Sequence, residues 1–198
     1  MQKNLNKNEK RIIKFLEEED QTREETLKLT REIGRIAANS IKKIHQRKFS
    51  EAENLIKKGI EILKKAKNLL KNYPEIYYSG FLHSAEKEII EALITLSIVR
   101  EKEIPDPYKY GFDCVSFLHG LCESTGEIKR FILDEIRKGK TSEPEKYLEV
   151  MDEIYFFLLN FQYPDGITRS LRRQIDYVRK TVESARSEIT LAKLTCKQ

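Results

Sequence analysis

The chain has 198 residues, of which 39% are hydrophobic and 35% charged, so it is long enough for one domain with a real core and too apolar for global disorder. Its net charge of +5 permits a polyanionic partner without requiring one. No apolar run approaches the ~20 residues that span a bilayer, and the first residues, MQKNLNKNEKRIIKF, lack the apolar core of a signal peptide. We therefore expect a soluble, cytoplasmic protein with no membrane partner.

The cysteines point to the same compartment. The spacings of Cys114, Cys122 and Cys196 match no zinc or redox motif, and their number is odd. A reduced, intracellular environment is the simplest explanation. We expect Cys114 and Cys122 to pack as small apolar side chains.

Helical periodicity runs through nearly the whole chain, and glycine and proline are sparse, so long helices with few breaks are expected. The first helix covers about 8–47, and its highly charged first turns predict that residues 1–20 fray or protrude. The second begins near Ser50, where Glu53 completes a capping box, and it stops before Tyr73–Pro74.

The third helix covers about 75–102. It ends at EIPDPYKYG, because the two prolines of this stretch disfavour helix continuation. The fourth helix covers about 110–138, with Gly139 as its C-terminal cap residue.

The fifth helix begins after Thr141 or Ser142 and includes IYFFLLNF, residues 154–161. By pattern alone this apolar run also fits a buried strand, but the sequence offers no partner strand, so we predict helix. Its aromatic side chains wrap several faces, which favours burial against a neighbouring subunit. A last helix covers about 166–194. The predicted fold class is all-α, a single domain over 1–198 with about six antiparallel helices.

Two glutamate pairs carry the candidate chemistry. Glu88 and Glu91 lie three residues apart on the third helix and border its buried face, while Glu123 and Glu127 lie four apart on the fourth. If these two helices are antiparallel neighbours, the four carboxylates can converge. Like charges in one pocket repel each other, and Mg²⁺ or Mn²⁺ with oxygen ligands offsets that repulsion.

A plainer interpretation of these pairs stands beside the metal site. In a helical chain this rich in acid, most such pairs are solvated faces or partners of lysine. Gly120 and Gly126, near the second pair, leave room for a ligand or for a close helix. His119 can ligate, shuttle a proton or pack, and packing is the commoner role for a lone histidine.

Several motifs, taken in order, resemble the translin-associated factor X branch of the translin family. GLCESTGEIKR (120–130) is similar to that branch's pattern G-x-x-D-x-T-G-E-x-x-R, and EIIEAL (88–93) to its E-x-x-E-A segment. The stretches over 23–46, 72–93 and 163–183 resemble the family's first, third and last helices. No single motif is specific, but the resemblance covers nearly all of the chain beyond its first 20 residues.

The resemblance implies an all-α subunit of six to seven helices that assembles into a closed, usually eight-membered barrel around single-stranded or short duplex nucleic acid. It implies a Mg²⁺- or Mn²⁺-dependent endoribonuclease site at Glu88, Glu91, Glu123 and Glu127. The family pattern has aspartate where this chain has Glu123, and the extra methylene puts the metal geometry in question. The translin branch generally lacks the first pair. We therefore expect a catalytic member that forms a homo-octamer or another closed ring.

Basic residues on three helices are candidates for phosphate contacts, and a solvated basic face is the alternative for those on the first and last helices. The nucleic-acid-binding candidates are Arg35, Lys42, Lys43, Arg47, Arg130, Arg172 and Arg173. Arg130 shares the carboxylate face and either clamps phosphate or pairs with Glu127.

The leading hypothesis is thus a Mg²⁺-dependent endoribonuclease that acts on single-stranded or short RNA. The alternatives are a non-catalytic binding protein for single-stranded DNA or RNA with the same fold, and a helical scaffold for a protein partner.

Overall fold

The computed structural model describes residues 2–140 and 142–195, and within this part of the chain all regular structure is helical, which confirms the all-α class. Thr141 and Cys196 lie outside the described residues. The long helices are α1 (Gln2–His45), α2 (Phe49–Leu69), α4 (Phe81–Val99), α6 (Cys114–Arg137), α7 (Ser142–Leu158) and α9 (Leu171–Thr195). The short ones are η1 (Leu70–Asn72), α3 (Pro74–Tyr77), α5 (Pro107–Tyr110) and α8 (Asp165–Thr168). None of the described helices is both long and apolar enough to cross a membrane.

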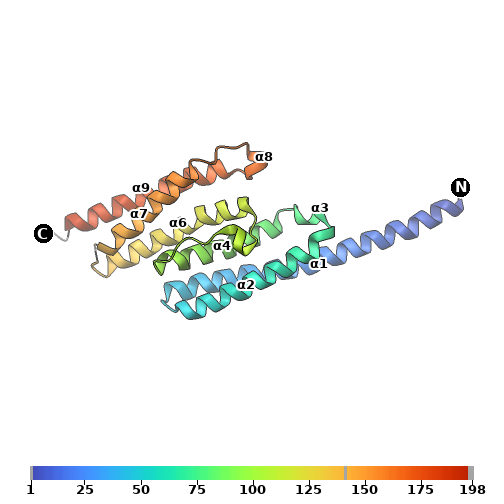
Figure 1. The fold of residues 1–198 in the computed structure, drawn as a ribbon, viewed down its shortest axis with the longest axis horizontal. Helices are drawn as coiled ribbons and strands as arrows, with labels where there is room; N and C mark the ends of the chain where they lie inside the picture. The colour runs from blue at the N-terminus through green and yellow to red at the C-terminus, as the bar shows by residue number, and fades with distance from the viewer. Residues whose placement is uncertain (1, 141, 196–198) are drawn as a thin grey trace.

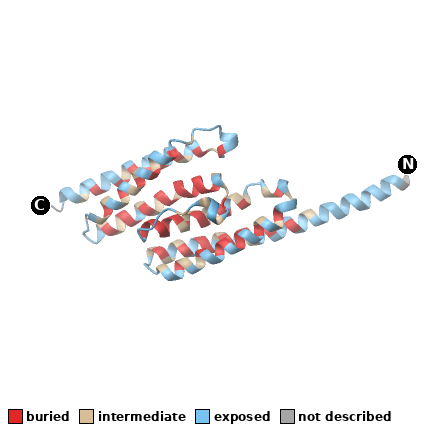
Figure 2. Ribbon diagram, in the orientation of Figure 1, coloured by how far each residue is buried: buried red, intermediate tan, exposed pale blue. Residues whose placement is uncertain are grey.

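The long helices form three stacked pairs. Helices α4 and α6 lie in the middle, α1 and α2 pack on one side of them, and α7 and α9 pack on the other (Figure 1). The two central helices are covered on both sides, so most of their residues are buried (Figure 2). The outer helices bury a single stripe each, as amphipathic helices on a protein surface do.

The central helices α4 and α6 are neighbours, but they run parallel. His83 near the start of α4 contacts Ser116 near the start of α6, with Nδ1 and Oγ 2.6 Å apart, and one turn later Lys87 reaches Glu123. The segment between them, about 14 residues over 100–113, can extend ~46 Å, whereas α4 is only ~28 Å long. The chain therefore returns to the start of α4 before α6 begins, and the antiparallel relation considered for this pair does not occur.

The start of α2 differs from the predicted one. The helix begins at Phe49, its N-cap is Lys48, and no side chain caps it, so the predicted capping box at Ser50 is wrong. A tight turn explains the early start. Arg47 has φ 62°, and the Lys48 amide donates to the Lys43 carbonyl at 2.9 Å, which leaves no room for a longer link.

Two predicted helices are divided in the structure, the third and the last, which consists of α8 and α9, and the fourth begins later than predicted. The third splits into α3 and α4 at Gly80, whose φ of 104° strongly favours glycine. The fourth starts only at α6, where the Asp113 carboxylate caps the helix by accepting from the Ser116 amide at 2.8 Å. Gly139, with φ 77°, follows the end of α6 and confirms the predicted stop.

The IYFFLLNF stretch is helical as far as Leu158, so the helix prediction is confirmed. Within this single chain Phe156 and Phe157 remain 63% and 46% exposed. The two cysteines also differ from each other. Cys122 is fully buried as expected, but Cys114 is exposed, which corrects its predicted packing.

Candidate active site

Three of the four predicted carboxylates line one pocket. The parallel arrangement of α4 and α6 brings Glu91 to the level of the α6 pair, and α9 closes the third side. The pocket measures about 340 Å³ and is lined by Glu91, Glu123, Gly126, Glu127, Gln174 and Tyr177. Its three glutamates are all partly buried, so this is not an ordinary solvated helix face.

Glu88 lies one turn before Glu91 and faces α1. A methyl group on Gly34 of α1 would lie 2.9 Å from Oε2 of Glu88, so the carboxylate sits directly against the α1 backbone. The pKa of Glu88 is raised above its ordinary value, chiefly by burial. The charge of Lys87 lowers it in part, and the charge of Glu123 raises it further. Glu88 does not line the pocket, but the charge of the pocket residue Glu123 still affects its pKa.

Glu91 has the most perturbed carboxyl group of the four. Burial raises its pKa to about 8, with further upward contributions from the charges of Glu123 and Glu127 and a downward one from Lys87. Both causes disfavour the charged form. At neutral pH and without a cation, Glu91 therefore carries a proton.

The two α6 carboxylates already have side-chain partners. Lys87 donates to Oε1 of Glu123 at 2.7 Å, and His45 at the end of α1 contacts Glu127. Arg130 lies 4.0 Å from Glu127 with its side chain 63% exposed, so it pairs only weakly and reaches solvent. The His45 Nδ1 atom is buried and has no hydrogen-bond partner within the described residues.

The types of these side chains suit a divalent cation, but their positions in the structure do not. Carboxylate oxygens are the donors that Mg²⁺ and Mn²⁺ prefer, and burial, followed by the charges of Glu123 and Glu127, raises the pKa of Glu91. Among the described residues, however, no group of three or more histidine, cysteine, aspartate or glutamate side chains is placed to hold a metal ion. For the carboxylates to share an ion, Glu123 has to leave Lys87 and Glu127 has to leave His45. The metal site therefore stays a prediction.

The basic candidates lie at both ends of the bundle. Lys43 and Arg47 lie near the end of α1, whereas Arg172 and Arg173 are exposed at the start of α9, at the opposite end (Figure 1). Arg47 pairs with the buried Glu135, and its guanidinium lies 5.4 Å from the ring centre of Phe131.

Those contacts show that Arg47 stabilises the fold by pairing with a buried carboxylate. Lys43 similarly pairs with Glu51 at 2.5 Å. Arg35 and Lys42 are exposed on α1. A role of these residues in nucleic-acid binding stays a prediction.

The structure also places residues that the sequence analysis left open or missed. His119 is buried, and its Nε2 lies 2.9 Å from the Thr168 carbonyl oxygen, so it packs rather than serving the pocket. Lys87, Gln174 and Tyr177 were not among the predicted site residues. Only Lys87 carries a local signal, because it precedes Glu91 by four residues on one helix.

No family model matches the sequence. The chain is 34% identical over 181 residues to the uncharacterized protein MJ0175 of Methanocaldococcus jannaschii, a match that covers 90% of this chain and 79% of that protein. The solved structure of AfC3PO with duplex RNA has a TM-score of 0.86 at 33% identity and covers 95% of this chain and 97% of its own.

The crystal structure of AfC3PO gives a TM-score of 0.88 at 33% identity, with 96% of this chain and 100% of that chain covered. Apo-NeC3PO, at 21% identity over 93% and 97% of the two chains, has a TM-score of 0.85 and so shares the fold. With a third of its residues identical to AfC3PO over nearly its whole length, the chain belongs to the C3PO (translin) family.

Proposed function

We propose that this protein is a metal-dependent endoribonuclease of the factor X-like branch, acting on single-stranded or short RNA inside a closed homo-oligomer. One observation carries the proposal: Glu91, Glu123 and Glu127 share a pocket in which burial and like charge raise the pKa of Glu91 to about 8. Such crowding is unfavourable unless a cation or a proton compensates it. Perturbed carboxyl groups in a pocket are typical of sites that bind metals or transfer protons.

RNA as the substrate is supported by a relative. AfC3PO, 33% identical to this chain over 95% of its length, has been solved in complex with duplex RNA. The net charge of +5 favours the approach of a polyanion. Arg130, exposed beside Glu127, is placed to contact a phosphate at the edge of the pocket.

In this proposal Glu88, Glu91, Glu123 and Glu127 would hold Mg²⁺ or Mn²⁺. The bound cation would supply neutralisation of phosphate charge and a lowered pKa of water. Lys87, once released from Glu123, keeps a positive charge beside the pocket. Tyr177, 54% exposed on α9, offers a ring on which a base can stack.

The test is cleavage of labelled RNA with Mg²⁺, with Mn²⁺ and with EDTA. The substitutions Glu91→Gln and Glu127→Gln keep the side-chain shape but remove a charged ligand. Each is expected to lower the cleavage rate at least about a hundredfold, because both the ion and its geometry depend on it. RNA retention in a gel-shift assay should stay nearly unchanged.

The matched control is Glu183→Gln, which removes an exposed glutamate of α9 that pairs with Arg179 on the same helix. It should cleave RNA like the wild type. Cleavage that persists in EDTA and in both pocket variants would remove the metal-site proposal.

A second candidate is a non-catalytic protein that holds single-stranded DNA or RNA. The Lys87–Glu123 and His45–Glu127 contacts favour it, because they give two of the carboxylates partners within the chain that no metal ion has to supply. Equal affinity for DNA and RNA, with no products in Mg²⁺ or Mn²⁺, would establish this candidate instead.

A further inference from the structure

The first part of α1 projects far beyond the bundle and has no neighbouring element (Figure 1). Every side chain over residues 4–18 is exposed (Figure 2). Five of them are large and apolar, each between 47% and 60% exposed: Leu5, Ile12, Ile13, Phe15 and Leu16. A helical segment of this length has only marginal stability in water unless it packs against another element. We therefore expect this apolar surface to pack against a partner.

Three of the five exposed apolar residues, Leu5, Ile12 and Phe15, continue the buried stripe of α1. Buried positions recur at helical spacing in the bundled part of the helix, beginning with Thr22 and Thr26. Steps of seven residues back from Thr26 reach Glu19, Ile12 and Leu5, and such steps back from Thr22 reach Phe15 and Asn8. The apolar members of this stripe are therefore Leu5, Ile12 and Phe15, and in the antiparallel pairing described below Asn8 of one copy faces Glu19 of the other. A stripe with this period is the seam of a two-helix coiled coil. Nothing in the described part of the chain covers it.

The charges along the projection are those of a segment that pairs with its own copy in antiparallel fashion. The four basic residues are Lys7, Lys10, Arg11 and Lys14, and the run over 17–20 is entirely acidic. Two parallel copies would set like charges side by side. Two antiparallel copies set the basic part of one against the acidic part of the other, and charges beside a coiled-coil seam decide orientation.

One antiparallel register satisfies both the seam and the charges. In this register Ile12 of each copy lies opposite Phe15 of the other copy, so the two-fold symmetry produces the same contact twice. Arg11 and Glu18 then lie on the same side of the seam, where opposite charges attract. The tip that carries Leu5 arrives at the level of Thr22 in the other copy, where its projection joins the bundle.

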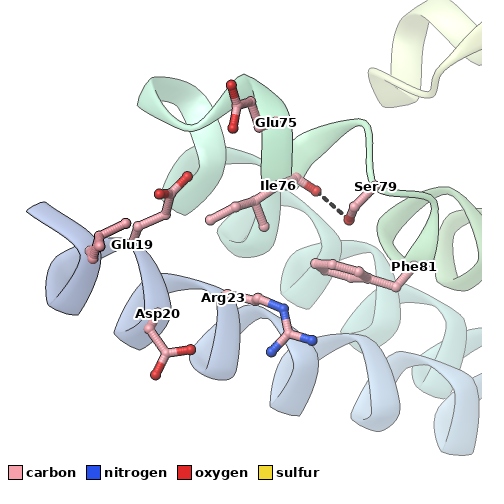
Figure 3. A pocket seen from close by; sticks show the side chains of 8 residues that line it. Glu19, Asp20, Arg23, Glu75, Ile76, Ser79 and Phe81 are labelled. Carbon is pink, nitrogen blue, oxygen red and sulfur yellow. Dashed lines mark hydrogen bonds between the residues drawn. The ribbon is translucent and has the colours of Figure 1, made fainter.

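A groove lies where the projecting part of α1 joins the bundle. It measures about 490 Å³ and is lined by Leu16, Glu19, Asp20, Arg23, Glu75, Ile76, Ser79 and Phe81. Figure 3 shows Ile76 and Phe81 directed toward α1 across this groove. It thus offers an apolar floor for Leu5.

We propose that residues 4–19 form a docking arm that pairs antiparallel with the docking arm of a second copy of this chain, each tip lying in the groove between α1 and α3 of the other. The arm lies outside the bundle and away from the glutamate pocket, so this inference does not depend on the proposed nuclease activity.

The first test is sedimentation velocity on the full chain. Ile12→Glu with Phe15→Glu should halve the mass of the assembly or weaken its association at least about tenfold, because charges are buried in an apolar seam. Arg11→Glu and Glu18→Arg should each weaken association, and the two together should restore it. Lys10→Glu makes the same charge change on the outer face and should leave the mass unchanged.

Thermal unfolding checks that the variants stay folded, since the substituted side chains touch nothing in their own bundle. An unchanged mass in the Ile12→Glu, Phe15→Glu variant would overturn the proposal. So would weakening by Lys10→Glu equal to that by Arg11→Glu, which would show a nonspecific effect of charge.

Cysteine cross-linking tests the direction of pairing. In a background with Cys114→Ser and Cys196→Ser, a mixture of the Ile12→Cys and Phe15→Cys proteins should form a disulfide-linked dimer on a non-reducing gel. Efficient linking of Ile12→Cys protein to itself would instead show parallel pairing, and no linking in the mixture would show that the arms do not meet.

Discussion

Glu91 makes the stability of the metal-free protein depend on pH. Burial and the charges of Glu123 and Glu127 raise its pKa to about 8, against an ordinary value of 4.5. A carboxyl whose pKa is raised by folding binds its proton more tightly in the folded state. Its contribution to stability is therefore complete below about pH 4.5 and is lost as the pH rises through about 8.

We expect the melting temperature of the metal-free wild type to fall between pH 5 and pH 9, and Glu91→Gln to remove most of that fall. One pKa unit corresponds to about 1.4 kcal/mol, so the full effect is at most several kcal/mol. Scanning calorimetry across this range measures it. Glu61→Gln, at an exposed position of α2, should keep the wild-type slope.

Addition of Mg²⁺ at pH 9 should recover the melting temperature of the wild type and leave Glu91→Gln unaffected, because a bound cation replaces the lost proton. Parallel pH profiles of the wild type and Glu91→Gln would show that Glu91 is not held in the protonated form.

At the scale of elements, the contact between α4 and α6 depends on Gly120. A methyl group there would lie 2.6 Å from Cγ2 of Ile90 and 3.0 Å from the backbone oxygen of Lys87, and neither neighbour can yield easily. Gly120→Ala should therefore push the two helices apart and lower the free energy of unfolding by about 1–3 kcal/mol. Urea denaturation gives the measurement.

Gly126→Ala is the matched control on the same helix. Its added methyl group would meet only the Tyr177 hydroxyl at 3.9 Å, an ordinary contact. Because alanine favours helix over glycine, this variant should gain up to about 1 kcal/mol. Shifts of the same sign and size in both variants would mean that α4 and α6 are not in close contact at Gly120.

The stop of α6 at Gly139 could be predicted from the sequence, because it follows from a local backbone preference. The helical state of IYFFLLNF could be predicted because the rest of the sequence offers no partner strand. The parallel course of α4 and α6 could not be predicted, because it depends on the route that 100–113 takes across the bundle. That route is a tertiary property with no periodic signal.

The candidate site also has a part that the sequence predicts and a part that it does not. The predicted convergence joined all four carboxylates and assumed antiparallel helices, whereas the pocket is lined by Glu91, Glu123 and Glu127 without Glu88 and lies between parallel helices. The contacts of these carboxylates with Lys87 and His45 depend on how the helices are rotated against one another. Periodicity within one helix does not reveal that rotation, and the α9 side of the pocket was missed for the same reason.

At the scale of the whole molecule, a second apolar surface lies at the end of α7 and in the segment that follows. Phe156, Phe157, Tyr163 and Ile167 are all exposed there. The all-round apolar pattern of this stretch predicts contact with a neighbouring subunit, and exposed apolar side chains are what such a contact would bury. A self-paired docking arm closes after two copies, so a larger ring needs a second, different interface. The α7 surface can supply it.

Phe156→Asp with Phe157→Asp should therefore reduce the assembly to the unit that the docking arms alone hold together. A ring encloses RNA only when it is complete, so RNA affinity should fall at least about tenfold because each smaller unit presents fewer phosphate contacts. The glutamate pocket lies within one chain, so Mg²⁺ binding measured by calorimetry should stay at the wild-type level. Full RNA affinity in a variant that sediments as the small unit would show that a single arm-linked unit binds RNA without enclosure.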